Sequence, residues 1–174
     1  RGEMDTRSEH PCILLVEDEL VTALMEERYL AKRGMTVLHV QSGEEAVDLV
    51  SSNHEIDMVL MDIDLGEGMD GTEASERILA IRELPVIFLT SHSEREMVER
   101  VKGITSYGYV LKSAGEFVLS ETVTMALDLF AARQDIRRQN AELRRANEAL
   151  GTAERKSEER RQYLEALLRH TPVA

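Results

Sequence analysis

Five short, mostly apolar runs alternate with stretches of helical spacing, and this alternation constrains the fold more than any other feature of the sequence. Short apolar runs bounded by polar or turn-forming residues are typical of strands buried on both faces of a sheet. Strands that alternate with helices form a parallel sheet through right-handed crossovers. The sequence therefore predicts an α/β fold with a doubly wound, five-stranded parallel sheet. The predicted strands are 12–16, 37–40, 58–61, 86–89 and 107–111.

Helix signals fill the segments between these runs. Apolar residues near helical spacing, among them Leu20 and Leu24, predict a helix that stops at Arg33–Gly34. Three pairs have the spacing of a capping box, a serine followed three residues later by a glutamate. These pairs are Ser42 with Glu45, Ser93 with Glu96, and Ser113 with Glu116.

The third helix is predicted from a different cap. Asp70 and Glu73 suggest its N-terminus, and we expect Ala74, Ile78 and Ile81 to form its buried stripe before Pro85 breaks the pattern. For the helix that follows the fifth strand, the predicted apolar face consists of Phe117, Val118, Val123, Ala126, Leu127 and Phe130.

Polar residues follow four of the five runs. In a parallel sheet, groups just beyond the carboxyl ends of the strands meet at one edge, where ligands bind. Gly66, Gly68 and Gly71 come soon after the third strand and would form a rim there. The groups expected to converge are Glu17, Asp18, Asp62, Thr90 and Lys112.

Carboxylates packed at one edge repel each other, so the pKa of at least one of them should rise. A hard divalent cation, Mg²⁺ or Mn²⁺, would relieve this repulsion. An aspartate such as Asp62 can act as a nucleophile toward a phosphoryl group. The cation, the ammonium of Lys112 and the hydroxyl of Thr90 could then each hold one phosphoryl oxygen. The sequence has no Gly-x-x-x-x-Gly-Lys loop, which disfavours a nucleotide as the donor.

Residues 11–130 resemble the receiver domain of two-component response regulators. The resemblance rests on 14–19 (Leu-Leu-Val-Glu-Asp-Glu), 61–64 (Met-Asp-Ile-Asp), 69–71 (Met-Asp-Gly), 89–91 (Leu-Thr-Ser) and 109–112 (Tyr-Val-Leu-Lys). It implies the flavodoxin-like fold and a metal-dependent phosphoacceptor. The implied roles are phosphoacceptor for Asp62, metal ligands for Glu17 and Asp18, a metal-binding backbone carbonyl for Asp64, phosphate pairing for Lys112, switch hydroxyl for Thr90 and switch aromatic for Tyr109.

The resemblance also implies a partner, a histidine kinase or a phosphotransfer protein, and labelling without multiple turnover. A haloacid-dehalogenase-like phosphohydrolase is the alternative, because Asp62 and Asp64 also fit a nucleophile and an acid spaced by one residue. Gly66 departs from the Thr or Val that this second family has two residues after its second aspartate.

Three positions depart from the usual receiver pattern. Ser113 stands where a cis-proline usually follows the lysine, so we expect either a trans peptide bond or strain there. Gly66-Glu67-Gly68 replaces a loop that often contains proline, and Glu17 is longer than the more frequent aspartate by one methylene. None of these changes removes a required group.

The C-terminal part of the chain has a seven-residue repeat that predicts a coiled coil. One stripe of the repeat is apolar except at Ser157, and the companion stripe is mostly polar. The two stripes together are called the seam below. The first stripe contains Ile136, Leu143, Leu150, Ser157 and Leu164, and the second contains Arg133, Asn140, Asn147, Glu154, Arg161 and Leu168. Since buried asparagines at such positions select parallel dimers, we expect a homodimer formed by this helix. A lone charged helix is the alternative.

These features divide the chain. We expect a disordered leader at 1–10, a receiver domain at 11–130, a coiled-coil helix at 131–168 and, at 169–174, the start of a further domain that resembles a PAS sensor. The net charge is −12; residues 131–174 hold ten Lys/Arg and seven Asp/Glu, so they carry +3 and residues 1–130 carry −15. This acidic body argues against nucleic acid or a membrane surface as a partner. The single cysteine, Cys12, favours a cytoplasmic location.

Overall fold

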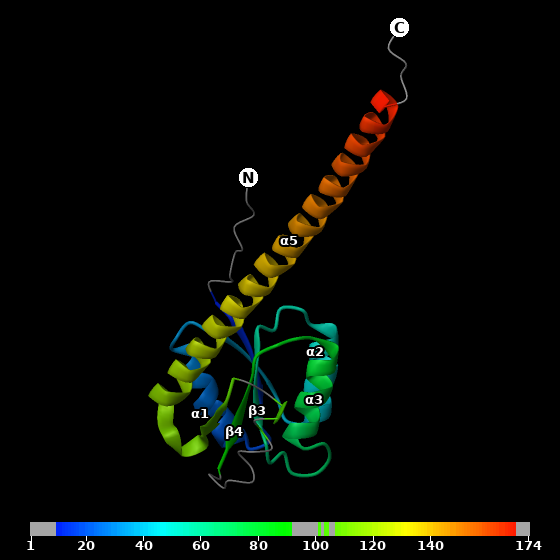
Figure 1. Cartoon of the computed structure of the whole chain (residues 1–174). Helices are drawn as coiled ribbons and strands as arrows, with labels where there is room; N and C mark the ends of the chain where they lie inside the picture. The colour runs from blue at the N-terminus through cyan, green and yellow to red at the C-terminus, as the bar shows by residue number, and fades with distance from the viewer. Residues whose placement is uncertain (1–9, 92–100, 102, 105–106, 170–174) are drawn as a thin grey trace. The chain divides into compact units, whose positions relative to one another are not determined.

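The computed structural model of the chain describes residues 10–91, 101, 103–104 and 107–169. The chain divides into two compact units, residues 1–130 and 131–174. The first contains a parallel five-stranded sheet with the strand order β2-β1-β3-β4-β5, so the predicted fold is confirmed (Figure 1). The strands are β1 (Cys12–Val16), β2 (Thr36–Val40), β3 (Met58–Asp62), β4 (Val86–Thr90) and β5 (Tyr109–Leu111).

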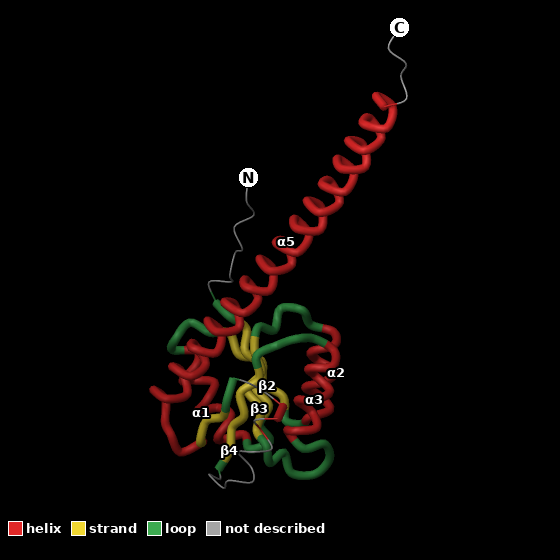
Figure 2. The backbone as a smooth tube through the Cα atoms, viewed as in Figure 1, coloured by secondary structure: helices red, strands yellow, loops and turns green. Residues whose placement is uncertain are grey.

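Helices cover both faces of this sheet, because alternate residues of each strand point to opposite sides (Figure 2). In β1, Leu14 and Val16 join the core beneath one pair of helices, whereas Ile13 and Leu15 join the core beneath the other pair. The first pair is α2 (Gly43–Ser52) and α3 (Gly71–Ile81), and the second is α1 (Leu20–Ala31) and the N-terminal part of α5 (Gly115–Arg169). The three central strands are buried on both faces, as their apolar runs predict.

Two of the predicted helix caps form. Ser42 accepts a hydrogen bond from the backbone N–H of Glu45, and Asp70 accepts from those of Thr72 and Glu73. The carboxylate of Glu45 reaches back to the N–H of Gln41, one residue before the position that a capping box uses.

The third predicted cap, Ser113 with Glu116, is wrong. Lys112–Ala114 forms a short 3₁₀ turn, and α5 begins at Gly115, which has a φ of 82° that favours glycine. Glu116 pairs instead with Lys32, the residue that follows α1, at 2.8 Å. The packing of α1 against α5 therefore determines where this glutamate points.

Two predicted helix faces also need correction. Ile81, expected in the buried stripe of α3, is 48% exposed. On α1, Leu20 and Leu24, whose spacing predicted the helix, are exposed. On α5, Phe117 and Val118 are exposed, and the buried face consists of Leu119, Ser120, Val123 and Ala126. Helical spacing identified the helices, but an apolar stripe wider than the available contact leaves its margins in solvent.

In the second unit, the described residues 131–169 are one uninterrupted helix, in agreement with the predicted coiled coil. Four apolar residues of the seam are exposed on the single chain: Ile136, Leu143, Leu150 and Leu164. Apolar residues repeated along one exposed stripe are the pattern that a coiled-coil partner covers.

The helix predicted after Ser93 lies largely outside the described residues, as do most of the predicted leader and residues 170–174. Of that helix the structure describes Val101, which is buried, together with Gly103 and Ile104, and all three are helical. Within the described part of the chain, no helix is both long and apolar enough to span a bilayer.

Candidate functional site

Asp62 is the last residue of β3, the central strand of the sheet, and it is only 2% exposed. It pairs in register with Leu89 of β4, and the next residue, Ile63, donates its N–H to the Leu89 carbonyl. The chain then turns back at Gly71, whose N–H bonds to the carbonyl of Ile63. These backbone contacts hold the Asp62 carboxylate at the carboxyl edge of the sheet, as predicted.

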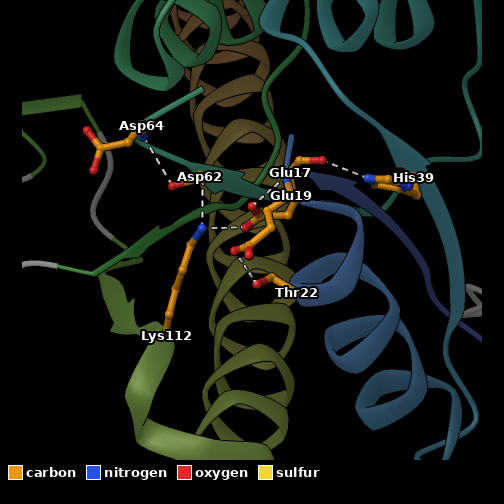
Figure 3. A network of polar contacts seen from close by, with 7 residues as sticks. All are labelled: Glu17, Glu19, Thr22, His39, Asp62, Asp64 and Lys112. Carbon is orange, nitrogen blue, oxygen red and sulfur yellow. Dashed lines mark hydrogen bonds and ion pairs between the residues drawn. The ribbon is translucent and has the colours of Figure 1, made fainter. Parts of the chain in front are cut away.

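Lys112 follows β5 and reaches across to this carboxylate (Figure 3). Its Nζ donates to Oδ2 of Asp62 at 2.7 Å. The same Nζ lies 2.5 Å from Oε2 of Glu17, an ion pair that lacks hydrogen-bond geometry. The other carboxylate oxygen of Asp62 accepts from the N–H of Asp64 at 3.1 Å. The Lys112–Ser113 peptide bond is trans. The single ammonium group of Lys112 thus forms ion pairs with two buried carboxylates.

Glu17, Asp18 and Asp62 form an acidic cluster in which one oxygen atom of each lies within 4.8 Å of the others. Glu17 and Asp62 are buried, and Asp18 is exposed. A single lysine against three carboxylates leaves two negative charges, and three carboxylate oxygens suit a divalent cation such as Mg²⁺. Gly66 keeps space beside this group, because a Cβ there would come within 3.0 Å of Oδ2 of Asp18. The residues present therefore fit a metal ion.

The pKa values of two carboxyl groups in the cluster, Glu17 and Asp62, are raised, as predicted for carboxylates packed together. Burial raises the pKa of Glu17 above its ordinary value, and the Asp62 charge adds to this, against the opposing effect of Lys112. Burial likewise raises the pKa of Asp62, again against Lys112. Burial lowers the pKa of Lys112, but its interactions with the Asp62 and Glu17 carboxylates outweigh this, so the net shift is upward. A cation at the cluster would favour the ionised carboxylates.

Two backbone contacts fix Glu17, and sequence reasoning identified neither. His39 of β2 contacts the carbonyl of Glu17 through Nε2 at 2.8 Å (Figure 3). The N–H of Glu19 donates to Oε1 of Glu17 at 3.1 Å. His39 lies one residue before the end of β2, which pairs with β1. This position beside the end of β1 could have indicated a contact with Glu17.

Glu26 is the second residue that sequence reasoning missed. It lies on α1, is 6% exposed, and its Oε2 has no hydrogen-bond partner among the described residues. The pKa of Glu26 is raised to about 7, chiefly by burial and also by the charges of Glu17 and Asp62, while Lys112 opposes the rise. Its spacing with Ala23 and Leu30, three and four residues away, places it on the buried face of α1 and could have revealed it.

The remaining predicted residues occupy the same edge. Thr90 ends β4, next to β3, and is buried. Tyr109 of β5 pairs with Phe88 of β4 and is 38% exposed, so its ring is partly in solvent in this conformation. Asp64 is exposed, two residues after Asp62. A carboxylate, an ammonium and a hydroxyl beside an acidic cluster form a set that can receive and hold a phosphoryl group.

Comparison with known proteins supports the same interpretation. The model of the response regulator receiver domain matches residues 13–124. The transcriptional regulatory protein PdtaR of Mycobacterium tuberculosis is 30% identical over 119 residues, which cover 68% of this chain and 57% of PdtaR. The chain thus spans a little over half the length of this curated relative.

Two solved structures extend the comparison. The N-terminal domain of a response regulator/sensory box/GGDEF three-domain protein from Carboxydothermus hydrogenoformans is 48% identical, with a TM-score of 0.66, over 70% of this chain and 98% of that one. A fusion containing the yeast Spc42 trimeric coiled coil is 41% identical, with a TM-score of 0.74, over 90% and 97% of the two chains. Neither these similarities nor the family match point to a haloacid dehalogenase.

Proposed function

The chain belongs to the response regulator receiver domain family, and on this premise we propose that Asp62 is its phosphoacceptor. The observation that carries the proposal is the position of the Asp62 carboxylate, buried at the end of β3 and bonded to Lys112 beside Glu17 and Asp18. A histidine kinase or a phosphotransfer protein would supply the phosphoryl group from a phosphohistidine.

In the proposed reaction, a carboxylate oxygen of Asp62 forms a bond to phosphorus while the P–N bond of the donor breaks. The electron pair of that bond leaves with the donor nitrogen, and the product is an acyl phosphate. The ammonium of Lys112, already 2.7 Å from Asp62, would neutralise charge on the transferred group. The backbone N–H of Asp64 holds the other Asp62 oxygen and so orients the carboxylate.

Glu17, Asp18 and Asp62 would hold the metal ion, Mg²⁺ or Mn²⁺, and the backbone carbonyl of Asp64 would complete its protein ligands. When bound, the ion would supply positive charge to the phosphoryl oxygens. We further propose that Thr90 donates its hydroxyl to the acyl phosphate and that the half-exposed ring of Tyr109 moves inward in response.

We predict that a small phosphoanhydride such as acetyl phosphate, with Mg²⁺, adds one phosphoryl group to the chain. Substitution Asp62→Asn should abolish this labelling, because an amide nitrogen is a far poorer nucleophile than a carboxylate oxygen. Intact-mass spectrometry measures the addition, and a sample with excess chelator provides the metal-free control.

Asp48→Asn is the matched control variant, since it removes an exposed carboxylate of α2 that lies outside the proposed site. It should still be labelled. Labelling that persists in Asp62→Asn would disprove the phosphoacceptor assignment. Because a receiver is labelled stoichiometrically, the chain should also show no multiple turnover with a generic phosphomonoester.

For the second unit, we propose a parallel homodimer formed through the long helix, which relays the state of Asp62 to a following domain. The exposed stripe of Ile136, Leu143, Leu150 and Leu164 supports this. Asn140 and Asn147, on the companion stripe, favour two strands in register over three. The polar residues of the seam keep the coil weak, so a few kcal/mol from the receiver would be enough to shift it.

We predict that Leu143→Asp with Leu150→Asp makes the chain monomeric, because two carboxylates would enter the seam. Ala141→Asp with Ala149→Asp adds the same charge off the seam and should leave the dimer intact. Sedimentation equilibrium measures the mass and also distinguishes a dimer from a trimer.

Truncation after Arg133 should have the same effect as the seam variant. An unchanged dimer after this truncation would show that the receiver faces, and not the helix, hold the chains together.

The following domain is proposed from two observations. The sequence of residues 163–174 resembles the opening of a PAS sensor, and the similar Carboxydothermus protein is a response regulator/sensory box/GGDEF three-domain protein. We therefore propose a sensor domain after the coiled coil, a leader at 1–10, and a cytoplasmic location for the receiver.

A further inference from the structure

A small cavity lies between α1, β5 and the start of α5, and Lys112 of the proposed site is one of the residues that line it. Its volume is about 20 Å³, and a volume of roughly 10–15 Å³ is enough for one water molecule. Six of the residues that line it are Glu26, Tyr29, Leu89, Val110, Lys112 and Leu119. Among these six, the side chains of Leu89, Val110 and Leu119 are apolar. The polar groups are the hydroxyl of Tyr29, the carboxylate of Glu26 and the ammonium of Lys112.

Glu26 contributes the carboxylate, and its burial is anomalous. The residue is 94% buried (6% exposed), yet Oε2 makes no hydrogen bond within the described part of the chain. A buried carboxylate oxygen without a partner is costly, so such groups are normally satisfied by protein or by an ordered water. A water in the cavity would satisfy Oε2.

Lys112 has hydrogen-bonding capacity to spare. An ammonium group carries three N–H donors. The structure gives it two carboxylate partners, Asp62 and Glu17, which leaves at least one donor for a third group. Glu17 is also a proposed metal ligand, and a carboxylate oxygen engaged by a cation is a weaker partner for an ammonium. Lys112 would then depend more on any third contact.

The orientation of the strands explains why Glu26 is near. Side chains alternate along a strand, so Asp62 points to the same face as Leu60, and Glu17 to the same face as Leu15. Leu15 and Leu60 pack in the core beneath α1 and α5. Glu26 lies on the buried face of α1, within electrostatic reach of Glu17, Lys112 and Asp62.

We propose that Glu26 is a positioning residue for Lys112, acting through one water molecule in this cavity. The water donates a hydrogen bond to Oε2 of Glu26 and accepts one from the Lys112 ammonium. This contact keeps the Lys112 ammonium oriented toward Asp62 when the Glu17 carboxylate binds a metal ion. The inference rests on the proposed function of Asp62 and Lys112, and it adds a residue that the receiver motifs do not contain.

The test compares Glu26→Gln with Glu26→Met in the full chain. Both variants remove the charge, but only glutamine keeps an oxygen that accepts from the water, while methionine matches its size without an acceptor. Labelling by acetyl phosphate with saturating Mg²⁺ should proceed in Glu26→Gln within about twofold of wild type. In Glu26→Met it should be about tenfold slower, the loss expected for one hydrogen bond to a charged group. Mg²⁺ affinity should change equally in both.

A second readout does not depend on the reaction. In metal-free protein, the ¹H–¹⁵N signal of the Lys112 ammonium should be observable in wild type and in Glu26→Gln, because hydrogen bonds slow its exchange with solvent. It should broaden or vanish in Glu26→Met. Glu27→Met, at the adjacent and partly exposed position, serves as the control for loss of a nearby charge.

Equal labelling rates and equal Lys112 signals in Glu26→Gln and Glu26→Met would overturn the inference. Failure of the proposed function is a separate outcome, because it would appear as wild-type labelling that survives Asp62→Asn.

Discussion

Gly71→Ala should lower the free energy of unfolding of the first unit by about 3 kcal/mol or more, at the upper end of single-substitution effects. A Cβ at this position would lie 1.9 Å from the carbonyl oxygen of Asp62 and 3.0 Å from Cα of Ile63. Both are backbone atoms of the segment that carries the phosphoacceptor, so no side-chain rotation can relieve the overlap. Labelling of Asp62 should fall as well, because the segment must shift.

Gly151→Ala provides the contrast. It lies in the long helix, and beyond the neighbouring backbone of that helix a Cβ there meets no heavy atom within 4 Å. Alanine is favoured over glycine in a helix interior by up to about 1 kcal/mol, so this change should stabilise the second unit slightly. Urea denaturation followed by circular dichroism measures both variants. Wild-type stability in Gly71→Ala would show that the close approach of Gly71 to Asp62 is absent in solution.

Glu26→Gln should stabilise the protein at pH 8 by about 3 kcal/mol and have a much smaller effect near pH 4.5. The pKa of Glu26 is raised from 4.5 to about 7, chiefly by burial. A carboxyl group with a raised pKa in the folded state gives stability that is fully present below about pH 4.5. That stability is lost as the pH rises through about 7, because the buried group must then ionise. Glutamine is uncharged throughout and avoids this loss.

Thermal or urea unfolding of wild type and variant across pH 4.5–8 measures the effect as the difference between the two curves. Glu17 and Asp62 also have raised pKa values, but they are present in both proteins and largely cancel in the difference. Glu27→Gln, one residue along α1, is the control and should show no comparable rise with pH. A constant difference between wild type and Glu26→Gln at every pH would show that folding does not shift the pKa of Glu26.

The amino-acid sequence alone determined the architecture. Five apolar runs of strand length, separated by helical patterns, allow one sheet type, because a strand buried on both faces needs helices above and below it. Strand polarity then brings the carboxyl ends to one edge, so the sequence predicts that Glu17, Asp18 and Asp62 meet there. The seven-residue repeat likewise predicted the long helix, since its regularity is local.

Only the tertiary structure decided how the elements cover one another. Periodicity shows which residues of a helix are apolar, but the neighbouring element determines which of them are buried. Ile81 and Leu24 therefore face solvent although their spacing suggested otherwise, and Glu116 pairs with Lys32 instead of capping its helix. The burial of Glu26 has the same origin. A glutamate on α1 reads as an exposed charge until α1 is packed against β5 and α5, where it loses water without gaining a direct hydrogen-bond partner for Oε2.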